Sequence, residues 1–414
     1  MKKTIALILS LTALWACQNL NSIEPPDEFN LSGQFGNFVD TVFYAQEAKF
    51  EVDYRAATGN GTNLCVGNYK NFNSAFFIKF VGLPADTMQI DSVFIELTSN
   101  GKFGQGESDL AIQVFEVDQE WDEHTINTLD EWHEYQPLEM IYQTDIPASD
   151  SLKVRIPLDT LLLNKWRYET DLNYGLMIKT VSEQDNHIRE FESFEVINDL
   201  DWPKIYYYVN EDDTTSILDS VRVGFDATIF DYPNPDGTNI FDLAQENQDL
   251  ILASGIPARL SVRFNILDSL AANYVMQAAD LEIDINDTDI ETNTTENPLD
   301  NSNQYAGFYL RSVTKTDSGL VVDSSFVISS DFSFVMQKSD NMISMSSANE
   351  KEEFGKNQIQ NIINGYKNTK WFSIQFIEET STVSVLRLFP LNSVENPNPI
   401  RLRLRYIEVT NTGF

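Results

Sequence analysis

The alternation of apolar and polar residues along the chain predicts short β-strands and little helix. The runs Ser92-Val93-Phe94-Ile95-Glu96-Leu97 and 111–117 alternate polar with apolar side chains, as a strand with one solvated face does. Helical periodicity is confined to residues 159–166 and 352–366. Parallel sheets need crossover helices, which this pattern lacks, so we expect an all-β protein built from antiparallel β-sandwiches of jelly-roll type.

Four short segments recur in the same order in the two halves of the chain, which indicates an internal duplication. The predicted matches are 40–43 with 226–229, 77–80 with 261–264, 173–178 with 370–376, and 203–206 with 399–402. The acidic stretch 210–220 is the expected join. We therefore predict a first domain over 36–212 and a second, tandem domain over 213–414.

The N-terminus has the pattern of a secretory signal peptide over residues 1–16. Two lysines precede an apolar stretch of 12 residues, which is shorter than the roughly 20 that a transmembrane helix needs. Leu14-Trp15-Ala16-Cys17 resembles the bacterial lipobox, in which the cysteine thiol receives a diacylglyceryl group. We expect a lipid anchor on Cys17, a flexible tether over 17–35, and attachment to the outer membrane or cell surface, since Gln18 is not the aspartate of inner-membrane retention.

Composition and charge exclude several classes of protein. The 63 Asp and Glu against 28 Lys and Arg give a net charge of −35, which opposes binding to nucleic acid. Two cysteines are too few for a disulfide scaffold, and Cys65 is predicted to be a buried thiol. The chain contains no nucleophile elbow, no zinc-protease helix motif and no phosphate-binding loop. With so many acids, a glycosidase pair cannot be singled out.

The first half resembles the DNRLRE family, whose jelly-roll modules are related to carbohydrate-binding module family 96. The resemblance is carried by Leu64-Cys65-Val66-Gly67, by Phe77-Ile78-Lys79-Phe80, and above all by Trp121, Glu123 and Thr125 in a Trp-x-Glu-x-Thr-Ile segment. Asn127 and Thr128 stand where the family has a second tryptophan, and the second half of the chain lacks the segment. The resemblance implies a secreted, non-catalytic sandwich, of which some members bind polysaccharide.

The same motif residues have a structural interpretation. Trp121 would plug the end of the sandwich, and Glu123 and Thr125 would bond to nearby backbone amides.

Two further kinds of site can be predicted from residue chemistry. Carboxylates crowd in 284–291 and 118–123, and hard oxygen ligands suit calcium, so Asp284, Asp287 and Asp289 are candidate ligands for a structural calcium ion. A solvated acidic loop explains the same residues. Flat aromatic rings stack on sugars, and the candidates for this role are Trp132, Tyr135, Trp166 and Trp202.

These observations favour a non-catalytic surface lipoprotein that binds extracellular polysaccharide or supports a glycan-binding envelope complex. The alternative is a structural or adhesion lipoprotein that docks another envelope protein, and a polysaccharide-degrading enzyme is the third hypothesis.

Overall fold

The computed structural model describes residues 37–408, apart from 54–57, 60, 70–71, 86–87, 105–107, 127–138, 148–152, 182–186, 213–214, 233–239, 267–273, 291–307, 317–318, 328–336, 340, 347–370 and 377–382. The described strands form two antiparallel sheets, which confirms the predicted all-β sandwich class. The α-helices of this part of the chain are α4 (Thr160–Tyr168) and α5 (Ile240–Asn247), and the short 3₁₀ helix η1 (Thr170–Leu172) follows α4. No helix among these residues has the length and hydropathy needed to span a bilayer.

The first sheet has ten strands in the order β12-β11-β5-β10-β3-β4-β9-β6-β7, with β8 beside β5. Its strands are β3 (Asn63–Tyr69), β4 (Phe72–Phe80), β5 (Ile90–Gly104), β6 (Leu110–Glu116), β7 (Glu139–Ile146), β8 (Lys153–Leu158), β9 (Leu176–Thr180), β10 (His187–Glu192), β11 (Lys204–Asp212) and β12 (Thr215–Asp231). The long strand β5 changes partners along its length, from β11 and β8 to β10, so one strand serves both parts of this half.

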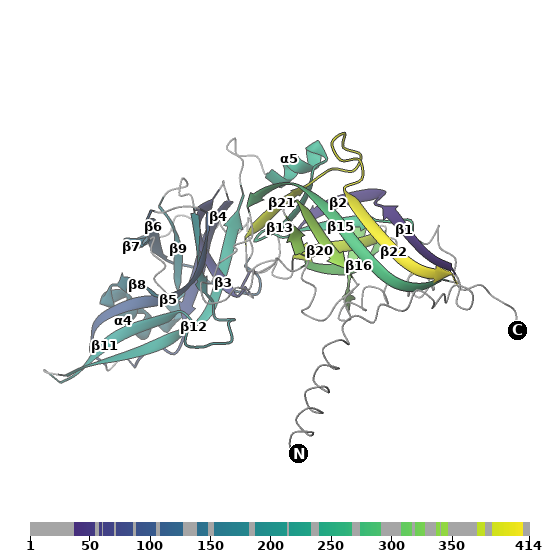
Figure 1. Ribbon diagram of the computed structural model, residues 1–414. Coiled ribbons are helices and arrows are strands. Elements are labelled where there is room, and N and C mark those ends of the chain that lie inside the picture. The colour runs from purple at the N-terminus through teal and green to yellow at the C-terminus, as the bar shows by residue number, and fades with distance from the viewer. Residues whose placement is uncertain are drawn as a thin grey trace, which may run out of the picture.

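The second sheet has twelve strands in the order β1-β22-β15-β21-β13-β14-β20-β16-β17, with β2 beside β14 and β19 beside β15. Its strands are β1 (Asn37–Tyr44), β2 (Glu47–Val52), β13 (Leu250–Ser254), β14 (Ala258–Arg263), β15 (Tyr274–Ile290), β16 (Phe308–Thr316), β17 (Gly319–Val327), β18 (Gln337–Ser339), β19 (Met342–Ser346), β20 (Trp371–Phe376), β21 (Ser384–Leu388) and β22 (Ile400–Glu408). Figure 1 shows the two β bodies side by side.

The two sheets repeat one topology. Eight strands of the first sheet correspond, one by one and in order, to eight strands of the second. The order in the first sheet is β11-β5-β10-β3-β4-β9-β6-β7, and the order in the second is β22-β15-β21-β13-β14-β20-β16-β17. In each sheet one long strand, β5 or β15, spans two sets of partners. The predicted matches in 77–80, 173–178 and 203–206 fall on corresponding strands of this order, as an internal duplication requires.

The halves exchange their first strands, which corrects the predicted domain boundaries of 36–212 and 213–414. β1 and β2, from the start of the first half, pair with β22 and β14 of the second. β12, from the start of the second half, pairs with β11 and β4 of the first. The expected join at 210–220 is the hairpin between β11 and β12. Sequence similarity does not show which half supplies the strand that pairs with a given sheet edge. The residue pattern alone therefore could not reveal the exchange.

The same pairing corrects the register of the first repeat match. Residues 40–43 lie opposite β22, whereas 226–229 lie opposite β4, so the two segments do not occupy equivalent positions. The predicted match of 40–43 with 226–229 is therefore shifted by eight or nine residues from the equivalence that the strand pairing gives. Period-two alternation repeats along every strand, so two short apolar runs can resemble each other in the wrong register.

Local sequence explains the elements that were predicted correctly. The Asp159 side chain accepts a hydrogen bond from the backbone N–H of Leu161 at 2.8 Å and caps α4, and Leu163 and Trp166 on its inner side are buried. In β5, Val93, Ile95 and Leu97 point into the core while Phe94 lies on the other face. The predicted helix at 352–366 lies outside the described residues.

A buried apolar cluster joins the two halves. Cys65, Phe72 and Ile188 of the first half pack with Phe50 of β2 and with Phe241 of α5. Cys65 is free and fully buried, as predicted, and burial raises the pKa of its thiol well above the ordinary value. Each half also has a core of its own, centred on Ile78 and Ile95 in the first half and on Leu260 and Leu404 in the second. The joining cluster is therefore additional to two complete cores.

Truncation of Phe50 tests whether the exchanged strand β2 is held by this joining cluster. Phe50→Ala removes a ring that is 5% exposed, and we expect a loss of about 3–4 kcal/mol in the free energy of unfolding, measured by urea denaturation. The matched control is Phe225→Ala on β12, whose ring is 40% exposed and should cost less than about 1 kcal/mol. Equal losses for the two variants would contradict the assignment of Phe50 to a shared core.

Candidate functional site

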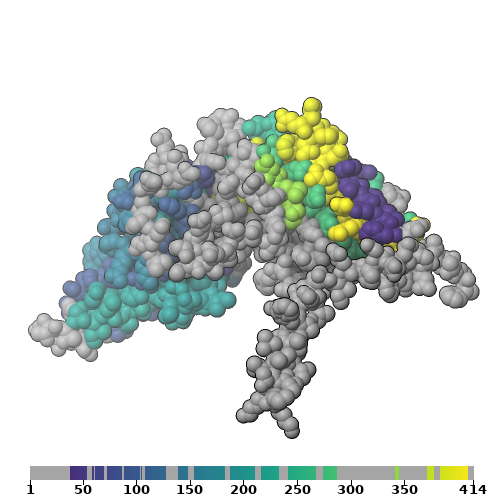
Figure 2. All heavy atoms as spheres, in the orientation of Figure 1, coloured from purple at the N-terminus to yellow at the C-terminus, as the bar shows by residue number. Residues whose placement is uncertain are grey.

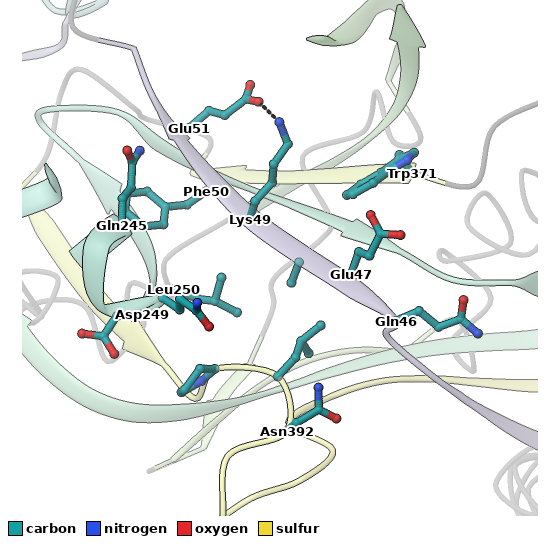
Figure 3. Close-up of a pocket in the computed structure, with 14 residues that line it drawn as sticks. Gln46, Glu47, Lys49, Phe50, Glu51, Gln245, Asp249, Leu250, Trp371 and Asn392 are labelled. Carbon is teal, nitrogen blue, oxygen red and sulfur yellow. Dashed lines mark hydrogen bonds and ion pairs between the residues drawn. The ribbon is translucent and has the colours of Figure 1, made fainter. Parts of the chain in front are cut away.

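A pocket of about 690 Å³ opens where β2 crosses the second half of the protein (Figure 3). Its walls come from 46–51, from the C-terminal end of α5 and the start of β13 at 245–250, from Trp371 at the start of β20, and from the turn 390–392. Segments that lie far apart in the sequence thus meet around one side of the exchanged strand. The volume lies within the range of small-ligand pockets.

Two lining residues have an unusual backbone conformation. Gln248 and Asn392, with φ of 62° and 64°, are the non-glycine residues with positive φ in the described part of the chain, and both line this pocket. Gln248 follows the end of α5, where the Asp249 N–H bonds to the Ala244 carbonyl at 2.9 Å and closes the helix. Asn392 follows Leu391 in a turn closed by the Ser393 N–H on the Pro390 carbonyl at 3.2 Å. Such conformations are typical of ligand-binding positions.

The carboxylates of the pocket are each engaged by a cation. Glu47 pairs with Arg263, Glu51 pairs with Lys49, and the Asp249 carboxylate lies 3.8 Å from Arg387. Figure 3 shows the Lys49–Glu51 pair beside the strand β2. Charge is therefore balanced within the wall, and the site does not call for a charged ligand.

Side-chain amides remain as the polar groups available to a ligand. Gln46, Gln245, Gln248 and Asn392 are all exposed, and none of them has a side-chain hydrogen bond within the described residues. An amide offers both donors and an acceptor, which suits hydroxyl groups. Trp371, 8% exposed and beside Glu47 in Figure 3, adds an apolar edge. The arrangement fits an uncharged ligand rich in hydroxyl groups.

Sequence reasoning missed this pocket. Its residues carry no motif, and apart from the six consecutive residues 46–51 they come from separate segments of the chain. The only local signal is the run of amides and acids Gln245-Glu246-Asn247-Gln248-Asp249, which reads equally well as a solvated helix end.

The structure excludes one predicted glycan-stacking residue and disfavours another. Trp166 is fully buried in the first core and its indole N–H donates to Glu116 at 3.3 Å, so it offers no ring face to a ligand. Trp202 is half-buried, with the Phe194 ring at 4.7 Å and the Arg222 guanidinium at 5.4 Å from its ring. These neighbours occupy the surface that a sugar would need. Trp132 and Tyr135 lie outside the described residues, as does Cys17.

The predicted calcium site is not assembled as expected. Both oxygens of Asp284 bind Arg401, at 2.7 and 2.9 Å, and Asn396 donates to the same carboxylate at 2.6 Å. An arginine thus supplies the positive charge that calcium was expected to supply. The side chains of Asp287 and Asp289 lie outside the described residues. Among those that the structure does describe, no group of three acid, histidine or cysteine side chains is placed to hold a metal ion.

The motif segment around Trp121 covers one face of the first sheet. The indole N–H of Trp121 donates to the Tyr174 carbonyl at 2.7 Å, and the ring packs 5.5 Å from Phe77 in an apolar cluster with Ile126 and Met177. It therefore packs on the sheet face beside Phe77. The Thr125 hydroxyl donates to the Asp122 carbonyl at 3.3 Å, so this bond is made to a carbonyl where an amide was expected.

Glu123 belongs to a cluster of three buried carboxyls with Glu195 and Asp226. Glu123 accepts a hydrogen bond from the Asp226 backbone N–H, and Asp226 accepts one from the Phe194 N–H at 2.7 Å. The Oε2 atoms of Glu123 and Glu195 are buried without a hydrogen-bond partner among the described residues. A turn at Gly59 closes over them, since a Cβ there would lie 2.3 Å from the Glu123 carbonyl oxygen. Among the described residues, the basic side chain paired with this cluster is His124, whose Nε2 lies 3.6 Å from Glu123.

Burial raises the pKa of all three carboxyls, and repulsion from the neighbouring carboxylates adds to the shift of Glu195 and Asp226. Loss of hydration, then the charge of Glu123, raises the pKa of Glu195 to about 7, with His124 opposing. Burial raises the pKa of Asp226 well above its ordinary value, and Glu195 and Glu123 add to the shift. Burial also raises the pKa of Glu123. The cluster is most stable when it retains protons.

No protein-family model matches the chain, and no curated protein matches it. The resemblance to the DNRLRE family therefore stays a prediction.

The carboxyl cluster predicts a stability that falls as pH rises. A folded-state pKa above the unfolded value gives stability that is present below about pH 4.5 and is lost as pH rises through about 7 for Glu195. Glu195→Gln should therefore leave the free energy of unfolding unchanged at pH 4 and raise it by about 1–2 kcal/mol at pH 8, allowing for solvent screening of this half-buried group. Urea denaturation at the two pH values measures both effects.

The matched control is Glu395→Gln, at an exposed position. It should change stability equally little at both pH values. A Glu195→Gln variant that is destabilised at pH 8 would show that the ionised carboxylate is needed, contrary to this interpretation.

Proposed function

We propose that this protein is a non-catalytic, lipid-anchored cell-surface protein that binds an uncharged extracellular polysaccharide in the pocket beside β2. The observation that carries the proposal is the pairing of every carboxylate of the pocket with a cation, which leaves four side-chain amides as its available polar groups.

The chemistry of the lining favours hydroxyl groups over charged groups. Amide side chains can donate and accept, so neighbouring hydroxyls of one sugar ring can be held by Gln245, Gln248 and Asn392 together. A net charge of −35 repels polyanions, which favours an uncharged glycan. The positive-φ backbone positions of Gln248 and Asn392 fix where their exposed amides start, and such preorganisation reduces the entropy lost on binding.

The same pairing argues against glycoside hydrolysis. Hydrolysis needs one carboxyl that donates a proton and a second carboxylate facing it across the bond that is cleaved. Glu47, Glu51 and Asp249 each face a basic side chain in place of a second carboxyl. A binding role does not require a pair of facing carboxyls and is compatible with these ion pairs.

Removal of single amides at the two positive-φ positions tests the proposal. Gln248→Gly and Asn392→Gly delete the amide while glycine keeps the backbone conformation, because it adopts positive φ without strain. We expect each to weaken binding to a panel of neutral polysaccharides by about tenfold, since one hydrogen bond is worth roughly 1.5 kcal/mol. Affinity electrophoresis or calorimetry measures the loss.

The matched control lies in the same loop as Asn392. Val394→Gly changes a fully exposed residue outside the pocket and should bind like the unmodified protein. If the unmodified protein binds no neutral polysaccharide, the proposal fails. If it binds but all three variants bind equally well, the binding surface lies elsewhere.

The anchor is tested separately through Cys17. We expect the chain to incorporate labelled palmitate in a bacterial host and the Cys17→Ser variant to lose the label and leave the membrane fraction, because two or three acyl chains are needed for stable anchoring. Cys65→Ser is the control and should keep the label, since Cys65 is buried within the fold. Label retained by Cys17→Ser would contradict the lipobox interpretation.

A further inference from the structure

The strand β1 forms an open edge of the second sheet. It pairs with β22 on one side, and no other strand of the described residues pairs with it. In Figures 1 and 2 it lies at the surface next to β22. Natural edge strands are usually protected from further pairing by proline, charged side chains or a bulge. β1, with the sequence NFVDTVFY and an uninterrupted register, has neither proline nor a bulge, and its single charged residue, Asp40, is paired with Arg403 of the same chain.

One face of β1 exposes a row of apolar side chains. Phe38 is 64%, Val42 40% and Tyr44 48% exposed, an unusual density of large apolar groups for eight residues of solvent-facing edge. On the opposite, core-facing side, Val39 and Phe43 pack against the second core and are only partly covered. Both faces of the strand therefore have apolar surface that a neighbouring strand could cover.

The backbone of β1 fixes which residues can pair at the open edge. The Ala45 N–H bonds to the Ile400 carbonyl at 3.0 Å, so the odd-numbered residues of this stretch direct their N–H and C=O groups toward β22. In an antiparallel ladder, direction alternates from one residue to the next. The even-numbered residues, Phe38, Asp40, Val42 and Tyr44, therefore present their backbone groups at the open edge.

We propose that a second copy of this chain pairs with β1 through its own β1, antiparallel across a two-fold axis that passes beside Thr41. Even-numbered residues of one copy must pair with even-numbered residues of the other, so the two-fold axis passes beside one residue. Only an axis at Asp40 or Thr41 is close enough to the middle of β1 for most of the strand to pair. An axis at Asp40 would set two like charges against each other. The axis at Thr41 sets Phe38 opposite the partner's Tyr44 and Asp40 opposite the partner's Val42.

The pairing at Thr41 is complementary on both faces. Phe38 and the partner's Tyr44 form an aromatic pair at each end, and such cross-strand pairs stabilise sheets. On the core side, Val39 meets the partner's Phe43, which extends the second core across the interface. Asp40 stays neutralised, because Arg403 of its own chain donates to it at 2.8 Å. A two-fold axis requires one surface to complement itself, and the β1 sequence does so in this register.

Cysteine cross-linking tests both the interface and its register. In the proposed dimer Thr41 faces its own symmetry mate in a non-hydrogen-bonded pair, where the Cα atoms lie about 4.5 Å apart, within the range of a disulfide. The Thr41→Cys variant of the full, detergent-solubilised chain should therefore oxidise to a covalent dimer. Phe43→Cys alone should not, but Phe43→Cys mixed with Val39→Cys should give a cross-linked heterodimer. The unmodified chain controls for Cys17 and Cys65.

A second variant tests the dimer without a cross-link. The N–H of Val42 points to the open edge, so Val42→Pro removes a hydrogen bond of the dimer and none of the ladder to β22. By light scattering we expect the unmodified chain to be a dimer and Val42→Pro to have a dimer dissociation constant at least tenfold higher, with an unchanged circular dichroism spectrum.

The outcomes distinguish the proposal from its competitors. A monomeric unmodified chain at micromolar concentrations, without cross-linking of Thr41→Cys, overturns it. Equal cross-linking of Thr41→Cys and Phe43→Cys alone would overturn the register. Cross-linking of Thr41→Cys to a different envelope protein in cells, with no homodimer, would assign the edge to that protein instead.

Discussion

Every backbone N–H and C=O group at a sheet edge must find a partner or face water, and this requirement organises the whole protein. Each half of the sequence leaves an open edge beside its last strand, β11 or β22. The strand that covers each edge comes from the beginning of the other half, β12 beside β11 and β1 beside β22, and the exchanged strand β2 pairs with β14. Because the exchange is reciprocal, neither sheet is complete without residues from both halves.

The exchange also explains why the halves share a buried cluster. Phe50 on β2 enters the second sheet, and Phe230 on β12 enters the first, so both apolar side chains meet between the halves together with Cys65 and Phe241. The pocket lies beside the same strand β2, against α5 and the turn 390–392, and Phe50 is one of its lining residues. A pocket built on an exchanged strand depends on the pairing of both halves, and its shape is fixed only when the whole chain has folded.

Many of the acidic side chains of this protein form ion pairs with arginine or lysine. Although acids outnumber bases by 35, the arginines of β22 bind Asp40, Asp280, Glu282 and Asp284 across three neighbouring strands. The pocket repeats this on a smaller scale. Where acids lie without such partners, as at Glu123, Glu195 and Asp226, burial raises their pKa values. Exposed ion pairs add little stability, so their main effect is to leave neutral surfaces in an acidic protein.

Residue patterning alone determined much of the architecture. Period-two alternation, turn residues and the scarcity of helical periodicity dictate an antiparallel all-β fold, and three of the four repeated segments correctly indicate its duplication. The capped helix at Asp159 and the burial of Cys65 follow from local chemistry in the same way. These properties depend on neighbouring residues, which a sequence displays directly.

Only the tertiary structure decided which half each strand completes and where the pocket lies. Strand exchange depends on which sheet edge is left unpaired when each half folds, and the type of an individual residue does not indicate this. Trp166 and Trp202 have the chemistry of sugar-stacking residues, but packing covers them, and Asp284 has the chemistry of a calcium ligand, but Arg401 binds it. Gln245, Trp371 and Asn392 meet only because three distant segments converge on β2. Burial and long-range proximity are properties of the folded chain, and for that physical reason residue type alone could not assign these sites.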